Sequence, residues 1–388
     1  MNTVPVYLDN NATTRIAPRA LEAMMPYLTD VYANPSSVHR LGHQAAAAVE
    51  HAREQVAAML GARPSEIIFT SGGTESNNAA LYGLAAARPA KRHIVATAVE
   101  HHALLEPLAR LEREGYRVTR LAVDAGGQID LDELRDALCD DTLLVSAMLA
   151  NNETGAILPV AEIARVAAER DVFVHTDAVS AAGKLAIDAE QLGVALLSLS
   201  AHKFHGPKGA GALYLRRGTP WRPLIVGGAQ ERDRRGGTQN VPGIIGMGVA
   251  CELVGAAMAQ DAERVRARRD RLAAGITERC PGARIIAADA PRLPNTACVC
   301  FPGIEAEALL ILLSEAGICV SSGAACSSGS LEPSHVLAAM GIDPAMAHGQ
   351  IRFSLSHLTT DAEIDHVLDT LPDLLARIST VSTEGTAR

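Results

Sequence analysis

The chain has 388 residues, of which 48% are hydrophobic and 20% charged, and its formal net charge is -9 at pH 7. This length and apolar content predict two domains, each large enough to bury a core. The acidic balance argues against nucleic acid or an anionic membrane surface as a direct partner. One basic run, residues 263–272, interleaves its arginines with acidic residues, which indicates a solvated helix face.

The cysteine content indicates a reducing compartment, because seven cysteines occur without the spacing of a disulfide framework. No basic segment followed by an apolar run opens the chain. The longest strongly apolar run, residues 308–313, is far shorter than the ~20 residues that span a bilayer. We therefore expect a cytoplasmic protein with no membrane partner.

Short apolar runs alternate with helix-like segments through the middle of the chain. Helical periodicity covers residues 131–138 and 160–170. The runs that predict buried strands are 66–70, 93–97, 142–149, 171–176 and 195–200. This alternation predicts an α/β fold with a mostly parallel sheet and helices on its faces. Sites in such sheets gather at the carboxyl ends of the strands.

Polar residues follow each of the five predicted strands. They are Thr74, His101, Asn152, Asp177 and the group Ser200, His202 and Lys203. Gly72 and Gly73 allow a tight turn before Thr74 opens a helix, which suits a phosphate at a helix N-terminus.

Lys203 lies in a turn rich in Gly and Pro, where it is well placed to form a Schiff base; an exposed turn lysine is the alternative. Asp177 can pair with a protonated pyridine nitrogen, or it can cap a helix that begins at Ala178. His101 can stack on a pyridine ring and exchange protons, or it can be a satisfied histidine at a strand end. Phosphate hydrogen bonds are available from Thr74, Ser200 and His202.

Other site classes find no support in the sequence. The run GPKGAG at 206–211 lacks the spacing of an NTPase phosphate loop, and no GxGxxG follows the first strand. We expect no metal site, and we assign Cys298 and Cys300 to core packing. Cys326 differs from these, because it lies in a run of Ser, Gly and Ala rather than among apolar neighbours.

The predicted domain organisation has three parts. Residues 16–262 form a large domain, residues 1–15 and 263–376 form a small α+β domain, and residues 377–388 form a polar tail. The small-domain elements are a helix at 263–278, a strand at 295–301, a helix at 306–317, a strand at 318–323 and a closing strand at 350–356.

A series of motifs extends along nearly the whole chain, from YLDNNATT (7–14) to RFSLSHLTT (352–360). The motifs between these are NPSSVH (34–39), GGTESNN (72–78), VEHHA (99–103), ANNETG (150–155), HTDAV (175–179), SAHKFHGPKGAGALY (200–214), RRGGTQN (234–240) and SSGAACSSGSLEPSHVL (321–337). With these motifs the chain resembles the NifS/IscS-type cysteine desulfurases, which are class V aminotransferases with the fold of fold-type I enzymes of pyridoxal 5'-phosphate (PLP).

This resemblance implies a role for each matching residue. Lys203 would bind PLP covalently, Asp177 would pair with the ring nitrogen, and His101 would stack on the ring. Thr238 would reach the phosphate bound by a partner subunit, which implies a homodimer. The remaining cofactor contacts would come from Gly73, Thr74, Asn152, Ser180, Ser200 and His202. The substrate contacts would come from Asn34, Asn152 and Arg352, the last two holding the carboxylate.

The implied reaction is PLP-dependent removal of sulfur from L-cysteine. Lys203 would help to move the Cα proton, and the Cys326 thiolate would attack the substrate sulfur. The products would be L-alanine and a persulfide on Cys326. A sulfur-acceptor protein would then take the sulfur for iron–sulfur cluster assembly, tRNA thiolation or DNA phosphorothioation, without direct contact with nucleic acid.

Four positions depart from the pattern of the resembling family. Ser180 replaces a glutamine that contacts the cofactor's phenolic oxygen, and Ala201 replaces a common glycine. In the segment that would reach the partner subunit, Asp233 replaces a usual glycine and Ala229 replaces a usual glycine or histidine.

Three other functions remain open at this stage. A class V aminotransferase would share Lys203 and Asp177 but would have no use for Cys326. A selenocysteine lyase would share the cysteine as well. A non-enzymatic sulfur acceptor or assembly partner would not need the complete set of Lys203, Asp177, His101 and Cys326.

Overall fold

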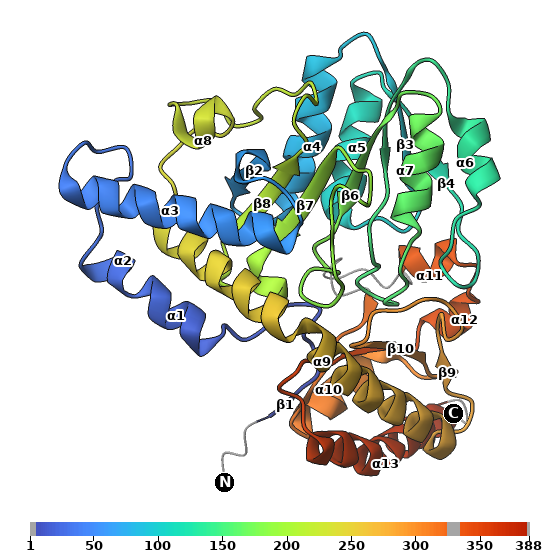
Figure 1. The fold of residues 1–388 in the computed structure, drawn as a ribbon. Coiled ribbons are helices and arrows are strands. Elements are labelled where there is room, and N and C mark those ends of the chain that lie inside the picture. The colour runs from blue at the N-terminus through green and yellow to red at the C-terminus, as the bar shows by residue number, and fades with distance from the viewer. Residues whose placement is uncertain (1–4, 324–333, 386–388) are drawn as a thin grey trace.

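The fold, given by a computed structural model, is described here for residues 5–323 and 334–385. Its larger part is built on a seven-stranded sheet with the strand order β2-β8-β7-β6-β5-β3-β4 (Figure 1). The strands are β2 (Ile67–Thr70), β3 (His93–Thr97), β4 (Arg117–Leu121), β5 (Thr142–Ser146), β6 (Phe173–Asp177), β7 (Leu196–Ser200) and β8 (Gly211–Leu215).

Strand directions bring the predicted polar residues to one edge of the sheet. All neighbouring strands are parallel except β8, which is antiparallel to both β2 and β7. Two reversals cancel, so β2 runs in the same direction as β7. The carboxyl ends of β2, β3, β5, β6 and β7 therefore lie at the same edge.

The five strands that the sequence predicted for this sheet are confirmed, whereas β4 and β8 were not predicted. β4 lies at the edge of the sheet and is mostly half-buried or exposed, so its sequence RVTRL lacks a continuous apolar run. β8 is fully buried, but it follows directly on the glycine-rich turn at 206–210, which hid its start.

Successive residues of a strand point to opposite faces of the sheet. Because the central strands are continuous runs of mostly apolar, buried residues, both faces of the sheet are apolar. Ile68, Ile94 and Leu144 pack with α4 (Gly73–Ala87) and α5 (His102–Arg113) on one face. Their neighbours Phe69 and Val95 belong to the core of the other face. That face is covered by α3 (Arg40–Met59), α7 (Val160–Ala168) and the first part of α9 (Val241–Arg279).

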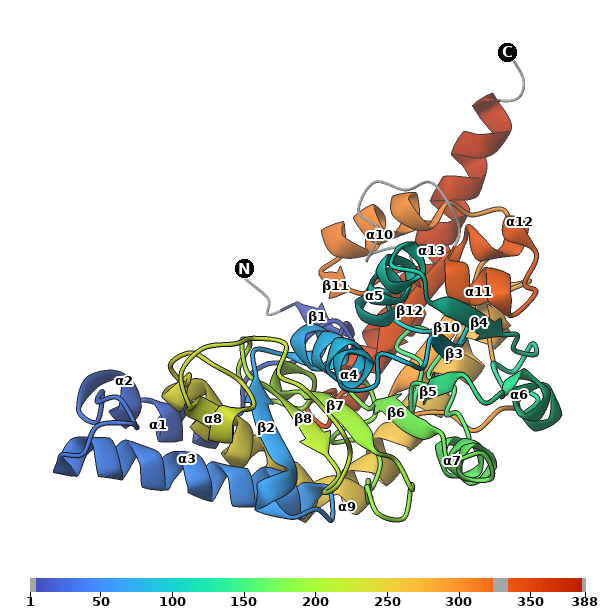
Figure 2. The ribbon, with the colours of Figure 1, turned by 90° about the horizontal axis from the view of Figure 1, so that it is seen from above.

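Shorter elements complete the larger part. These are α1 (Pro18–Met24), α2 (Pro26–Thr29), α6 (Leu131–Ala137), α8 (Gln230–Asp233) and the 3-10 turns η1 (Pro64–Glu66) and η2 (Ala201–Lys203). Figures 1 and 2 both show α1, α2 and α8 together at one end of the molecule. The predicted helices at 131–138 and 160–170 are confirmed by α6 and α7.

The smaller part has its own apolar core. Its strands form an antiparallel sheet in the order β12-β10-β9 and a parallel pair of β1 with β11. Its strands are β1 (Val6–Tyr7), β9 (Arg284–Ile285), β10 (Thr296–Cys300), β11 (Ile318–Cys319) and β12 (Gln350–Ser354). Its helices are α10 (Ala306–Glu315) and α13 (Asp361–Gly385). Between them in sequence lie α11 (His335–Ala339) and α12 (Pro344–Ala347), whose buried residues pack with the core of the larger part.

The core of the smaller part joins distant segments of the chain. It packs Val6 and Leu8 against Leu272 of α9, Ile351 of β12 and Leu371 of α13. This composition agrees with a small domain made of both chain ends. The predicted boundaries themselves stay a prediction, and the one at 262/263 falls inside the continuous helix α9.

The helix predicted at 263–278 is the second half of α9, which is 39 residues long. Among the described residues, α9 is also the one helix whose length and apolar composition would allow it to cross a membrane. Half of the stretch that meets this test is buried inside the protein, as in the core helix of a folded domain.

Candidate active site

A cavity of about 280 Å³ lies at the carboxyl edge of the sheet, between the larger part and the segment around β12. It collects ten of the predicted site residues: Gly73, Thr74, His101, Asn152, Asp177, Ser180, Ser200, His202, Lys203 and Arg352. Its remaining lining comes from Asn11, Ala12, Asn77, Ala103, Met148, Ala150, Val179 and Ser321.

Asp177 is the last residue of β6, and it is buried. One carboxylate oxygen accepts a hydrogen bond from Asn77 Nδ2 at 2.7 Å, and the other accepts one from the Val179 N–H at 2.9 Å. The chain continues from Asp177 in turns, so the alternative that Asp177 caps a helix is wrong. An ionised carboxylate has about four acceptor positions, which leaves room for a further donor from the cavity.

Lys203 ends the 3-10 turn η2, directly after β7. Its Nζ donates to the carbonyl oxygens of Asn11 at 2.5 Å and Ala12 at 2.8 Å. These carbonyls belong to the DNNATT segment, which lies close to Lys203 although it is about 190 residues away in sequence. The amine therefore lies at the cavity wall and is held by the N-terminal segment, not in an exposed turn.

His101 precedes α5 and caps its N-terminus, because its Nδ1 accepts a hydrogen bond from the Ala103 N–H at 3.0 Å. Burial lowers the pKa of His101; Asp177 opposes this effect and Lys203 reinforces it. A neutral imidazole that accepts through Nδ1 carries its proton on Nε2. His101 can therefore exchange a proton with a group in the cavity through Nε2.

The N-terminus of α4 forms a cradle for an anion. Gly72 precedes α4 with φ +156°, and a Cβ on Gly211 would lie 2.5 Å from the Gly72 Cα. Thr74 in the first turn and Ser200 at the end of β7 add hydroxyl groups to the same cavity. Free N–H groups and the helix dipole favour negative charge at such a terminus.

His202 contributes to the same wall as a neutral group. Burial lowers the pKa of His202 to about 4, and nearby lysines act in the same direction. Its Nδ1 lies 3.1 Å from the Thr13 hydroxyl oxygen. At neutral pH His202 can therefore act as one hydrogen-bond donor and one acceptor, without adding charge to the cradle.

Arg352 in β12 supplies a buried cation on the side of the smaller part. Its guanidinium donates through Nη1 to the Asn152 carbonyl at 3.1 Å and through Nη2 to Asp9 Oδ1 at 2.9 Å. Its Nε is buried and has no hydrogen-bond partner in the described part of the chain. This unused donor beside the cavity suits an incoming carboxylate.

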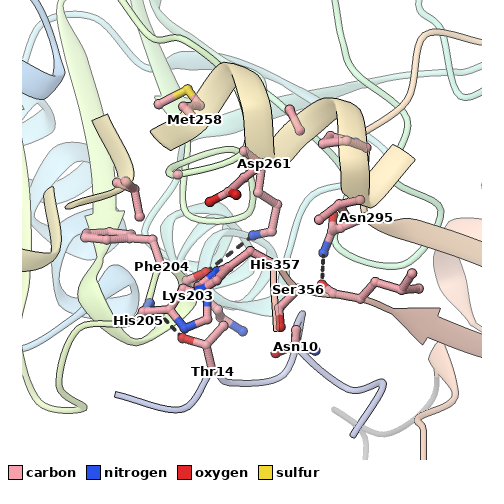
Figure 3. A pocket seen from close by; sticks show the side chains of 17 residues that line it. Asn10, Thr14, Lys203, Phe204, His205, Met258, Asp261, Asn295, Ser356 and His357 are labelled. Atoms are coloured by element: carbon pink, nitrogen blue, oxygen red, sulfur yellow. Dashed lines mark hydrogen bonds between the residues drawn. The ribbon is translucent and has the colours of Figure 1, made fainter. Parts of the chain in front are cut away.

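A second cavity, of about 60 Å³, adjoins Lys203, with His205, Asp261 and His357 among its lining residues (Figure 3). Lys184 also lines it, and its amine donates to the carbonyl oxygens of Ser180 at 2.9 Å and Lys203 at 3.4 Å. Burial lowers the pKa of Lys184 to about 7, and the positive charges of Lys203 and Arg352 act in the same direction. Lys184 thus links the turn after β6 to the turn after β7.

Two predicted site residues that the structure describes, Asn34 and Thr238, are not in the main cavity. Asn34 is exposed before α3, where its Oδ1 accepts from the Ser36 N–H at 2.9 Å. Thr238 is exposed and lines a separate cavity of about 80 Å³ beside Glu231. Cys326 lies outside the described residues.

Two residues of the cavity, Asn77 and Asn11, lie within the motifs, but the sequence analysis assigned no role to either. Asn77 lies in GGTESNN and positions Asp177, while its own Oδ1 is buried without a partner in the described residues. Asn11 lies in DNNATT and donates to the Asn152 carbonyl at 3.0 Å. Lys184 follows HTDAV by five residues, and nothing in its local pattern revealed that its amine is enclosed.

The class V aminotransferase family profile matches residues 6–367. The chain belongs to the class V aminotransferase family. Cysteine desulfurase 2 of Trichormus variabilis is 52% identical over 377 residues, which cover 97% of this chain and 94% of the relative. The resemblance to cysteine desulfurases that the motifs indicated is therefore confirmed.

Two solved structures are similar to this chain over nearly its whole length. A NifS-like protein superposes with a TM-score of 0.91 at 43% identity, covering 96% of this chain and 99% of the other. The protein SspA, solved in complex with cysteine, gives a TM-score of 0.81 at 37% identity, covering 91% and 99%. The predicted fold of a fold-type I PLP-dependent transferase, with a mostly parallel seven-stranded sheet, is confirmed.

Class V aminotransferases are PLP enzymes, and the donor set of the cavity fits this cofactor. Lys203 offers an amine, Asp177 a carboxylate with spare acceptor capacity, and the start of α4 an anion cradle. The buried Asn77 Oδ1 has no partner within the described segments, so the cavity also holds an unused polar atom. The aldehyde, the ring nitrogen and the phosphate of PLP thus each have a matching group.

Proposed function

We propose that this protein is a PLP-dependent cysteine desulfurase that converts L-cysteine into L-alanine and leaves the sulfur as a persulfide on Cys326. The observation that carries the proposal is one cavity in which Lys203, Asp177 and His101 face Arg352 from the smaller part. Full-length relatives that are named cysteine desulfurases support the same activity. The fold and family are those of such an enzyme.

The residues of the larger part would hold PLP. Lys203 would bind its aldehyde, Asp177 would accept from its ring nitrogen, and the cradle of Gly73, Thr74, Ser200 and His202 would bind its phosphate. PLP, when bound, supplies an electron sink for chemistry at the substrate's carbon atoms. His101 is a neutral imidazole beside this site and can stack on the ring and transfer a proton.

Ser180 stands where the resembling family has a glutamine that contacts the phenolic oxygen of PLP. It is buried and lines the cavity, and its backbone carbonyl accepts from Lys184. Because a serine hydroxyl does not extend as far as a glutamine amide, a bridging water would complete its contact with the phenolic oxygen.

Arg352 and Asn152 would bind the carboxylate of L-cysteine. Arg352 carries the buried Nε that lacks a partner in the described part of the chain, and its Nη1 holds the Asn152 carbonyl in place. The structure of the relative SspA in complex with cysteine supports this substrate. The predicted contact of Asn34 with the substrate would require its loop to approach from outside the cavity.

The sulfur step can be written with a complete balance. Lys203 would move the Cα proton, and the Cys326 thiolate would attack the substrate sulfur. One carbon–sulfur bond breaks and one sulfur–sulfur bond forms, while the substrate's Cβ takes up a proton. L-cysteine and one thiol thus give L-alanine and one persulfide, without an external oxidant or reductant.

A homodimer would complete the site through Thr238. This residue is exposed and outside the main cavity of its own chain, as a residue that reaches a partner's phosphate would be. Several large apolar residues are exposed in the segments that contain or adjoin α1, α2 and α8: Leu21, Met25, Leu28, Tyr32, Val38 and Val226. Figures 1 and 2 show α1, α2 and α8 at the same end of the molecule, and a second copy would cover this surface.

The sulfur would leave on an acceptor protein in the cytoplasm. Iron–sulfur cluster assembly, tRNA thiolation and DNA phosphorothioation are all served by such transfer. The net charge of -9 favours a protein acceptor over direct contact with nucleic acid.

The test is to incubate the PLP-loaded protein with L-cysteine and to locate added sulfur by peptide mass spectrometry. Extra sulfur on the Cys326 peptide with equimolar alanine is expected, and Cys326→Ser should abolish both. Cys139→Ser is the matched control, because hydrogen bonds from Thr142 and Arg117 lower the pKa of that partly exposed thiol. Keto-acid without alanine would indicate an aminotransferase, and activity on selenocysteine alone would indicate a lyase.

A further inference from the structure

Two described residues that flank residues 324–333 meet at one buried carboxylate. Glu153 is 4% exposed and follows Asn152 in the ANNETG turn. Its Oε2 accepts hydrogen bonds from the Ser334 hydroxyl at 2.5 Å and from Gln350 Nε2 at 3.3 Å. Gln350 in turn accepts from the Gly323 N–H at 3.2 Å through its Oε1. Gly323 and Ser334 are thus held by the same pair of side chains.

The approach of Gly323 to this pair is too close for any other residue. A Cβ at this position would lie 2.0 Å from Glu153 Oε2 and 2.2 Å from Gln350 Oε1. Both side chains are buried, at 4% and 2% exposure, so they have little space to withdraw. The backbone at Gly323 is therefore seated against the carboxylate by shape as well as by hydrogen bonds.

The other flank has two further attachments. The Ser334 hydroxyl that donates to Glu153 also accepts from the Val336 N–H at 3.1 Å, so it caps the start of α11. The next residue, His335, makes a 2.9 Å contact through Nε2 with the Glu100 carbonyl and packs its ring 5.0 Å from that of His102. This flank is therefore fixed on the turn that carries His101.

The Gly323 flank is continuous with the substrate side of the cavity. Ser321 lines the cavity and pairs with Arg352 through backbone hydrogen bonds of 2.6 and 3.3 Å. Cys326 follows Gly323 by three residues, and three residues span at most about 11 Å. The position of Gly323 therefore sets the volume that the Cys326 thiol can reach.

We propose that Glu153 is a positioning residue for sulfur transfer: together with Gln350 it fixes Gly323 and Ser334, and so keeps Cys326 within reach of the substrate sulfur. This inference rests on the proposed desulfurase function. A reacting thiol that is displaced by about 1 Å can lose on the order of 100-fold in rate. Substrate binding depends on Arg352 and Asn152 and should change much less.

The experiment compares Glu153→Ala, Glu153→Gln and Gly323→Ala with the wild-type holoenzyme. We expect Glu153→Ala and Gly323→Ala to lower kcat for alanine and persulfide formation by about 10- to 100-fold. KM for L-cysteine should stay within about threefold, because the groups that bind the carboxylate are unchanged. Glu153→Gln should recover part of the rate, since its amide oxygen can still accept from Ser334.

Glu66→Gln is the matched control. This glutamate is also buried and also accepts two hydrogen bonds, but its donors are the N–H groups of Arg63 and Arg217 rather than Ser334 and Gln350. Its replacement should leave kcat unchanged. Wild-type kcat in both Glu153→Ala and Gly323→Ala would overturn the inference, and so would a loss in Glu66→Gln as large as that in Glu153→Ala.

A second readout separates this inference from the proposed function. The rate at which iodoacetamide alkylates Cys326 in the resting holoenzyme, followed by mass spectrometry, should change at least about threefold in Glu153→Ala and Gly323→Ala, with Cys139 alkylation constant as an internal reference. If wild-type protein forms no persulfide, the proposed function fails while these rates still test the anchoring. Unchanged Cys326 rates in folded variants would overturn it. If Glu153→Ala does not fold, Glu153→Gln and Gly323→Ala decide the matter.

Discussion

The buried ion pair between Arg53 and Glu231 should dominate the stability of the segment at 227–240. The two side chains are 2% and 1% exposed, and the guanidinium meets both carboxylate oxygens, at 2.7 and 2.8 Å. Burial alone would raise the pKa of Glu231, but hydrogen bonds and charge from Arg53 hold that pKa below its ordinary value. The carboxylate also accepts from the Phe69 N–H at 2.9 Å and from Gln239 at 2.5 Å.

The perturbation is a double-mutant cycle of Glu231→Ala and Arg53→Met. Glu231→Ala leaves the guanidinium charge buried without its main partner, which should lower the free energy of unfolding by about 3–5 kcal/mol. Arg53→Met leaves the carboxylate uncompensated and should cost about the same, while it preserves much of the side-chain stem volume. The double variant buries neither charge, so its loss should be smaller than the sum by about 2–3 kcal/mol.

Urea unfolding at pH 7 with saturating PLP would measure the four free energies of the cycle. The control cycle is Arg110 with Glu114, an exposed pair at the C-terminal end of α5 with a 2.9 Å contact, which should show no measurable coupling because solvent screens both charges. Additivity within about 0.5 kcal/mol at the buried pair would refute the reasoning, because it would mean that neither charge depends on the other.

Three further predictions follow from single residues. Asp233 adopts φ +62°, a backbone conformation that glycine tolerates better than other residues. Asp233→Gly should therefore raise the free energy of unfolding, measured with urea, by about 0.5–1 kcal/mol. A lower free energy of unfolding would show that the aspartate side chain contributes a stabilising contact of its own. Arg352→Lys should raise KM for L-cysteine by at least about tenfold in steady-state assays, since an ammonium cannot replace the planar fork that also binds Asp9; an unchanged KM would remove Arg352 from substrate binding. Burial raises the pKa of Glu100 to about 8, so the folded protein holds a proton that the unfolded chain releases near its ordinary pKa of 4.5. The free energy of unfolding of wild type relative to Glu100→Gln should therefore fall as pH rises from about 5 to 8, and a pH-independent difference would contradict this assignment.

Local patterns determined the elements and much of the candidate site. The apolar runs at β2, β3, β5, β6 and β7 were readable because each of these strands is buried on both faces. The polar residues after them, such as Asp177 and Lys203, could be grouped without a structure, since parallel strands share one carboxyl edge. The motifs added the family. β4 was not predicted, because an exposed edge strand needs no continuous apolar run.

Tertiary packing decided the contacts between segments that are far apart in sequence. Glu153 meets Ser334 across 181 residues, and Arg53 meets Glu231 across 178. No periodicity encodes such pairs, because each arises only when both segments have packed on the same core. The same holds for Lys184, whose amine is enclosed only by the folded chain. The sequence by itself thus determined which groups would gather at the sheet edge, and the fold decided which buried side chains hold them there.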